Sequence, residues 1–90
     1  MIINNKWQSL LIMDEYIDNY INKNIIITGN DDDMILSCNI RYDLNKDNDL
    51  FLPISYQAIA KRLLTYKSIK KRIIKGSMHY IGIRYKENNQ

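Results

Sequence analysis

The clearest pattern in the chain is a helical repeat of apolar residues over residues 6–22. Its apolar side chains recur mostly every three or four residues, so they share one face of a helix and leave acidic and amide side chains on the other. Asn4 or Asn5 can cap this helix, because a short side-chain oxygen accepts from a free first-turn N–H. The repeat predicts an amphipathic first helix through Trp7, Leu10, Leu11, Met13, Ile17, Tyr20 and Ile21.

The next part of the chain mixes two patterns. A β-branched run over residues 25–28, closed by Gly29 and Asn30, predicts a short strand and a turn. Residues 33–44 alternate apolar and polar like a strand, yet they also carry a helical stripe, and the three aspartates 31–33 suit a helix N-terminus. The local pattern leaves strand and helix open for this stretch; the stripe consists of Leu36, Ile40 and Leu44.

A second amphipathic helix is predicted over residues 56–66. A polar loop over residues 45–49 precedes it, Pro53 blocks continuation of the strand-like residues 50–52, and Ser55 is the expected N-cap. The apolar stripe of this helix is Tyr56, Ile59, Ala60, Leu63 and Leu64, and the residues on the opposite surface are Gln57, Lys61, Arg62 and Thr65.

The C-terminal part predicts a β-hairpin. Two β-prone runs, residues 68–74 and 78–86, flank a turn at residues 75–77 that contains a glycine. One face of this hairpin is expected to bury Ile69, Ile73, Ile81, Ile83 and Tyr85. The other is expected to expose Lys70, Arg72, Lys75, Arg84 and Lys86. Together with the helices, the expected core includes Trp7, Leu10, Ile17, Ile59, Leu63, Ile73 and Ile83.

Length and composition indicate one small domain over residues 1–90, with residues 87–90 frayed. No apolar run approaches the roughly 18–20 residues of a membrane span, and residues 1–12 are too polar for a signal peptide. We therefore expect an intracellular protein of the cytoplasm or nucleus that contacts no membrane. Cys38 is the only cysteine, which excludes an intramolecular disulfide and favours a buried, inert thiol.

The charge is strongly asymmetric along the chain. Residues 1–55 carry four basic and nine acidic residues, net −5, whereas residues 56–90 carry nine basic residues and one acidic residue, net +8. A basic segment beside an acidic one indicates a surface that binds a polyanion. The alternative is that the two halves neutralise each other within the fold.

No residue pattern points to catalysis, to a cofactor or to a metal. Asp43, Asn45 and Asp47 match the first ligands of a calcium loop, but Asn48 replaces the required glycine and Ile54 the bidentate glutamate. The aspartates 31–33 are more typical of a turn and helix cap than of a metal cluster. One histidine and one cysteine cannot build a structural zinc site, and no nucleophile lies in an activating motif, so we expect a protein that is not an enzyme.

The basic residues of the second helix and of the hairpin form the one constellation with a functional meaning. Lys61 and Arg62 precede a cluster that ends at the hairpin glycine: Lys67, Lys70, Lys71, Arg72 and Lys75. A helix beside a basic hairpin can contact base edges and phosphates together. His79, in the second run, is expected either to contact a phosphate or base or to be a hydrogen-bonded structural residue.

The same segment resembles a known family. Lys70-Lys71-Arg72, followed by residues 75–86 with their Gly76 turn and a His79-Tyr80-Ile81-Gly82-Ile83 strand, resembles the wing of regulatory-factor-X type DNA-binding domains. It also looks like the winged-helix tail of primase-helicases from large DNA viruses and phages. The resemblance covers residues 55–86 best, matches residues 24–50 poorly, and has a shorter wing turn without that family's arginines.

The resemblance implies an α+β winged helix of three helices and a C-terminal wing, in which residues 33–44 are the second helix and pack on residues 6–22. It implies non-catalytic binding of double-stranded DNA, as in a viral DNA-binding or regulatory protein. The expected contacts are Gln57, Lys61, Arg62, Lys67, Lys70, Lys71, Arg72, Lys75, His79 and Arg84. The alternative is a protein-interaction adaptor on the same fold, because a fold alone does not establish a function.

Overall fold

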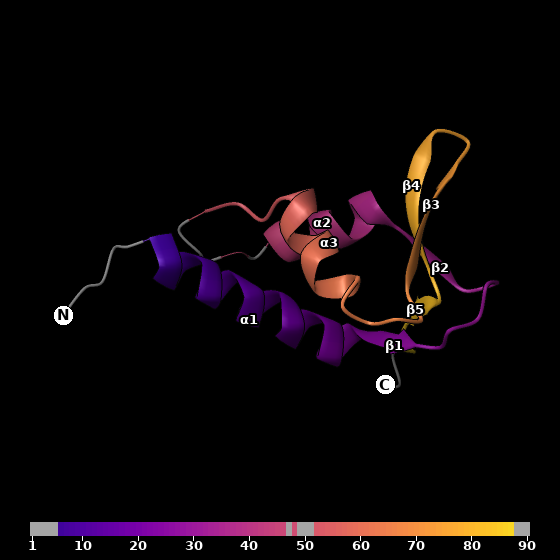
Figure 1. Ribbon diagram of the computed structural model, residues 1–90, viewed down its shortest axis with the longest axis horizontal. Helices are drawn as coiled ribbons and strands as arrows, with labels where there is room; N and C mark the ends of the chain where they lie inside the picture. Colours follow the sequence, from indigo (N-terminus) through magenta and orange to yellow (C-terminus); the bar gives the residue numbers. More distant parts are fainter. Residues whose placement is uncertain (1–5, 47, 49–51, 88–90) are drawn as a thin grey trace.

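The computed structural model describes residues 6–46, 48 and 52–87, and for residues 6–11 the backbone only. The described chain forms an α+β domain with the order α1 (Lys6–Asn24), β1 (Ile25–Ile27), β2 (Met34–Leu36), α2 (Ser37–Lys46), α3 (Tyr56–Leu63), β3 (Lys70–Ile74), β4 (Ser77–Ile81) and β5 (Ile83–Tyr85). In Figure 1 the long α1 runs along one side, α2 and α3 pack beside it, and the β3–β4 hairpin stands away from the helices.

The strands form two small antiparallel sheets. One has the order β2-β4-β3, so the strand before α2 pairs with the last strand of the hairpin; the other pairs β1 with β5. The sheets meet at Gly82, whose N–H donates to the Asp33 carbonyl (2.8 Å) and whose carbonyl accepts from Thr28 and Gly29. A Cβ on Gly82 would lie 2.6 Å from the Ser68 carbonyl oxygen, and its φ of +94° favours glycine.

Residues 33–44 contain both a strand and a helix, and the expectation of one continuous helix is wrong. Residues 34–36 pair with β4 and bury Ile35, after which α2 continues the helical stripe through Ile40 and Leu44. The aspartates 31–33 form the turn between β1 and β2 instead of a helix N-terminus: the Asp32 N–H donates to the Asn30 side chain. A partner strand distant in sequence decided the conformation of this segment.

Helix α3 confirms its predicted N-cap. The Ser55 hydroxyl accepts from the Ala58 N–H at 3.1 Å. The helix ends at Leu63, three residues before the predicted end at residue 66, and Leu64 is 37% exposed although it was expected in the apolar stripe. The residues before the cap are held by α2, because the Asn45 amide donates to the Ile54 carbonyl (3.0 Å) and accepts from its N–H (2.8 Å). Asn45 therefore belongs to α2 and fixes the start of α3, instead of lying in the predicted loop.

The predicted hairpin is present with two corrections. Its turn is the pair Lys75 and Gly76, both with positive φ (52° and 82°), as a two-residue type I′ turn requires. The second run is not one strand, because Gly82 divides it into β4 and β5. The expectation that Ile73 is buried is wrong: it is 72% exposed, since the tip of the hairpin extends beyond the helices.

The core lies where α1, α2, α3 and both sheets meet. It confirms Ile17, Ile59, Leu63 and Ile83 from the predicted core, whereas the side chains of Trp7 and Leu10 lie outside the described residues. The expectation that Tyr85 is buried is wrong, because it is 38% exposed. The expected caps Asn4 and Asn5, the strand-like residues 50–51 and the frayed end from residue 88 onward also lie outside the described part. The buried side chains are Met13, Ile17, Ile21, Ile25, Ile35, Ile40, Leu44, Ile54, Ile59, Leu63, Ile69, Tyr80, Ile81 and Ile83.

Candidate nucleic-acid interface

The cations of the hairpin are divided between its two faces. Side chains alternate along a strand, and residues paired across antiparallel strands share a face. Arg72 is opposite His79, so Arg72 and, two residues earlier, Lys70 lie on one face. Lys71 is opposite the buried Tyr80 and lies on the other face, toward α3. A cluster that is continuous in sequence thus becomes a ribbon with positive charge on both faces.

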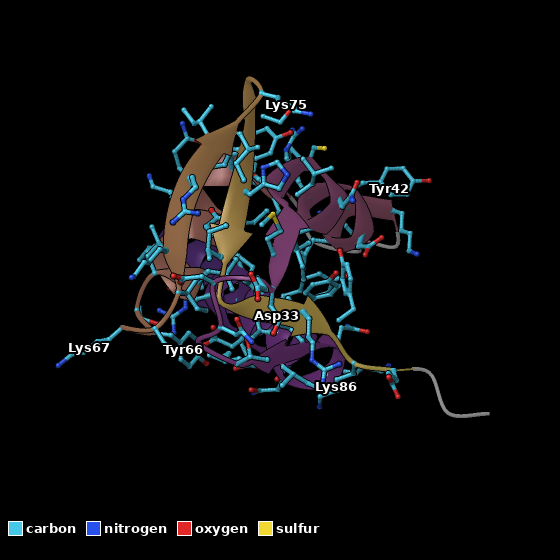
Figure 2. All side chains as sticks on the ribbon, turned by 90° about the vertical axis from the view of Figure 1, so that its right-hand side faces the viewer. Asp33, Tyr42, Tyr66, Lys67, Lys75 and Lys86 are labelled. Carbon is cyan, nitrogen blue, oxygen red and sulfur yellow. The ribbon has the colours of Figure 1, made fainter. Side chains whose placement is uncertain are left out.

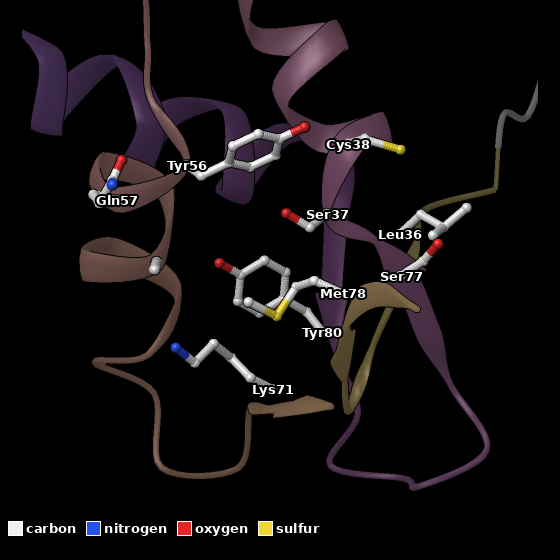
Figure 3. Close-up of a pocket in the computed structure, with 10 residues that line it drawn as sticks. Leu36, Ser37, Cys38, Tyr56, Gln57, Lys71, Ser77, Met78 and Tyr80 are labelled. Carbon is white, nitrogen blue, oxygen red and sulfur yellow. The ribbon is translucent and has the colours of Figure 1, made fainter. Parts of the chain in front are cut away.

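A groove of about 510 Å³ separates the hairpin from α2 and α3. Figure 3 shows Lys71 and Met78 extending from the hairpin toward Gln57 and Tyr56 of α3. The groove is mainly apolar, with the Lys71 ammonium and the Gln57 amide as polar groups beside it. Its lining residues are Leu36, Ser37, Cys38, Tyr56, Gln57, Ala60, Lys71, Ser77, Met78 and Tyr80.

Arg41 fixes the Tyr56 ring at this groove. Its guanidinium carbon lies 4.8 Å from the ring centroid, a cation–π distance, and its Nε donates to the Ile54 carbonyl at 3.2 Å. Sequence reasoning missed both Tyr56 and Arg41 as residues of the candidate site. Tyr56 fitted the apolar stripe of α3, and no sequence pattern indicates a contact between residues 15 positions apart.

The two cations of α3 contact acidic residues of α1, although Lys61 stays exposed and Arg62 is only partly buried. The Arg62 guanidinium donates from Nε and Nη2 to the Asp18 carboxylate at 2.9 and 2.8 Å, and this hydrogen bonding raises the pKa of Arg62. The Lys61 ammonium lies 3.4 Å from an oxygen of Asp14. The acidic and basic halves of the chain therefore form ion pairs at α3. The uncharged side chain of Gln57, on the same helix, remains exposed.

The other predicted contacts are less closely grouped. Lys75 lies at the tip of the hairpin, and Lys67 projects from the turn that precedes β3, at the opposite end (Figure 2). Arg84 is exposed on β5, in the second sheet. The structure thus places Lys70, Lys71, Arg72 and Lys75 on one hairpin and leaves Arg84 away from it.

His79 is half-buried beside Arg72, and its ring is already hydrogen-bonded. Nδ1 lies 3.0 Å from the Ser77 carbonyl oxygen. Because a carbonyl can only accept, Nδ1–H is the donor, and in the neutral ring Nε2 is left as an acceptor. This bond fits the structural role that the sequence left open for His79.

Cys38 is exposed, so the prediction of a buried thiol is wrong. It lies in the first turn of α2, where Ser37 and Ile40 take the buried positions and Cys38 faces outward.

Among the described residues, no group of three or more His, Cys, Asp or Glu side chains could hold a metal ion. Asp43 and Asn45, which matched a calcium loop, both lie within helix α2, where Asp43 accepts from the Tyr20 hydroxyl (2.9 Å).

Within the described part of the chain, no helix is both long and apolar enough to cross a bilayer. Comparison of the chain with protein-family models, with curated proteins and with solved structures finds no match.

Proposed function

We propose that this protein is a winged-helix module that binds double-stranded DNA and acts by contact instead of catalysis. The fold part of the proposal is supported by the order α1, β2, α2, α3, β3, β4 and by the sheet order β2-β4-β3. In a winged helix, the strand between the first two helices likewise pairs with the last strand of the wing, and β3–β4 takes the position of the wing. The β1–β5 pair is an addition to this arrangement.

The function part rests on one observation, which is the difference between the cations of α3 and those of the hairpin. Lys61 and Arg62 have carboxylates beside them. Across residues 6–46, 48 and 52–87, in contrast, no ion pair includes an exposed cation of the hairpin: Lys70, Lys71, Arg72 or Lys75. Exposed cations that the fold itself does not neutralise are available to phosphates.

We propose different contacts for the wing and for α3. The wing supplies phosphate contacts, which set affinity and register, and the exposed end of α3 supplies a base contact. Gln57 suits that role, because its amide can make two hydrogen bonds to the N6 and N7 atoms of adenine. Lys61 and Arg62 support α3 from the side of α1 instead of meeting the duplex.

A salt series tests the proposal. Each phosphate contact contributes about 0.9 to the slope of log affinity against log salt, so Lys71→Ala and Arg72→Ala are each expected to lower its magnitude by about that amount. Lys23→Ala is the matched control, because it removes the same charge from the exposed last turn of α1. Unchanged affinity and slope in both wing variants, with folding intact, would contradict the proposal and favour a protein partner.

A further inference from the structure

Ile73 is the most exposed of the large apolar side chains in the described part of the chain, at 72%. It lies on β3 opposite Met78, which lines the groove beside α3, so the two residues form a short apolar ridge on the same face as Lys71. Met78 joins Ile73 to the mainly apolar groove, and a continuous exposed apolar surface among cations indicates a contact with a partner.

The charges around Ile73 indicate which kind of partner fits this surface. Three of the five residues of β3 are cations, and they lie on both faces of the ribbon. A second copy of the chain pairing along β3 would bring these cations together, which opposes such a dimer. A groove of duplex DNA has phosphates along its edges and bases on its floor, so it would instead suit a ribbon that carries cations around an apolar ridge.

We propose that Ile73, supported by Met78, enters the base stack as a wedge and kinks the duplex. This inference rests on the proposed function and adds a mechanical role to it. A cationic ribbon that enters a groove carries its exposed apolar side chain to the level of the bases, where the face of an unstacked base is the apolar surface available. Apolar side chains of this kind open base steps and bend DNA when cations hold the flanking phosphates. Lys71, on the same strand face, and Lys70 and Arg72, on the opposite one, are placed to hold those phosphates.

The test measures DNA bending with the whole protein. Energy transfer between dyes at the two ends of a short duplex is expected to rise when the parent protein binds. With Ile73→Ala it is expected to stay near the value of the free duplex, while the salt slope of the affinity is unchanged because no charge is removed. Ile12→Ala is the matched control, since Ile12 is an exposed isoleucine (50%) on α1.

A duplex with one mismatched pair sharpens the test, because its step is already partly unstacked. The parent is expected to prefer it over the matched duplex by roughly tenfold, the ratio that corresponds to 1.4 kcal/mol, and Ile73→Ala to lose that preference. Equal bending by the parent and Ile73→Ala, or none by either while DNA is bound, would overturn the wedge and leave DNA binding standing. Self-association that Ile73→Ala abolishes would also overturn it, in favour of a second copy. Absence of DNA binding by the parent would instead defeat the proposed function itself.

Discussion

The guanidinium of Arg62 holds the carboxylate of Asp18 through two hydrogen bonds, of 2.9 and 2.8 Å, and thereby joins α3 to α1. Asp14, one turn earlier in α1, lies 3.8 Å from the same guanidinium. Arg62, which the sequence suggested as a DNA contact, thus has an ion-pair partner within the protein. We therefore expect this contact to help hold α3 in place beside α1.

Removing Arg62 should therefore reduce the stability of the fold. We expect Arg62→Ala to lower the free energy of unfolding by about 1–2 kcal/mol, a value reduced for the partial exposure of both partners. Lys61→Ala, which breaks a single longer contact of an exposed ammonium, should cost a few tenths of a kcal/mol. Urea denaturation measures both variants. Equal free energies of unfolding for the two variants would mean that the two hydrogen bonds of Arg62 stabilise the fold no more than the single contact of Lys61.

The Asn45 amide should be needed to fix the start of α3. Asn45→Ala leaves the N–H of fully buried Ile54 without this acceptor, while the Ile54 carbonyl still accepts from Arg41, so we expect a loss of about 1–3 kcal/mol. Thermal melts compare it with Asn39→Ala, which truncates an exposed amide on the same helix. A loss no greater than that of Asn39→Ala would contradict the role of Asn45.

Two glycines with similar backbone angles should respond differently to alanine. Gly76→Ala should cost about 1 kcal/mol, because its φ of +82° is unfavourable but no atom lies within 4 Å of the new methyl group. Gly82→Ala adds a 2.6 Å clash with the backbone oxygen of Ser68 and should cost more than about 2 kcal/mol. Chemical denaturation of the two variants isolates the clash, and equal losses would show that the strands shift freely around it.

Stability should decline in alkali. Burial raises the pKa of Tyr20 and Tyr80, and the hydrogen bond to Asp43 raises the pKa of Tyr20 further. The unfolded chain loses a phenolic proton near about pH 10 while the folded chain keeps it, so this stability is complete below about pH 10 and is lost as pH rises toward the folded pKa. Between the unfolded and the folded pKa, each such tyrosine lowers the free energy of unfolding by about 1.4 kcal/mol for every pH unit.

Urea midpoints between about pH 8 and pH 11 measure this decline. Tyr20→Phe should make it shallower, because one raised pKa is removed. Tyr42→Phe is the control, since Tyr42 is 69% exposed, and should leave the slope unchanged. A flat profile across this range would show that the folded and unfolded chains bind the same number of protons, which would contradict the raised pKa values.

Cys38 should react readily in the native protein. Its exposed position in the first turn of α2 gives a thiol reagent direct access, so alkylation of folded protein should approach the rate in denaturant. The reaction is followed by mass spectrometry at neutral pH. A rate many times slower in the folded protein would contradict the exposure of Cys38 and support the buried thiol that the sequence predicted.

The sequence by itself determined the features that depend on neighbours along the chain. The helical repeat before residue 24, the Ser55 cap of α3 and the turn at Gly76 follow from periodicity, from one short hydroxyl side chain and from a residue that tolerates positive φ. The α+β class follows from the same signals, because they separate helical from extended segments before any packing is considered.

Tertiary structure alone decided the features that depend on distant partners. Residues 34–36 became a strand because β4 pairs with them, and β4 and β5 separate at Gly82 because the turn from the first half of the chain packs there. Contacts likewise divided the basic cluster of the sequence: Arg62 is held by Asp18, whereas Lys71 and Arg72 are exposed on the β3–β4 hairpin. A one-dimensional pattern cannot show these differences, since charge and apolarity are properties of a residue whereas pairing and exposure are properties of its surroundings.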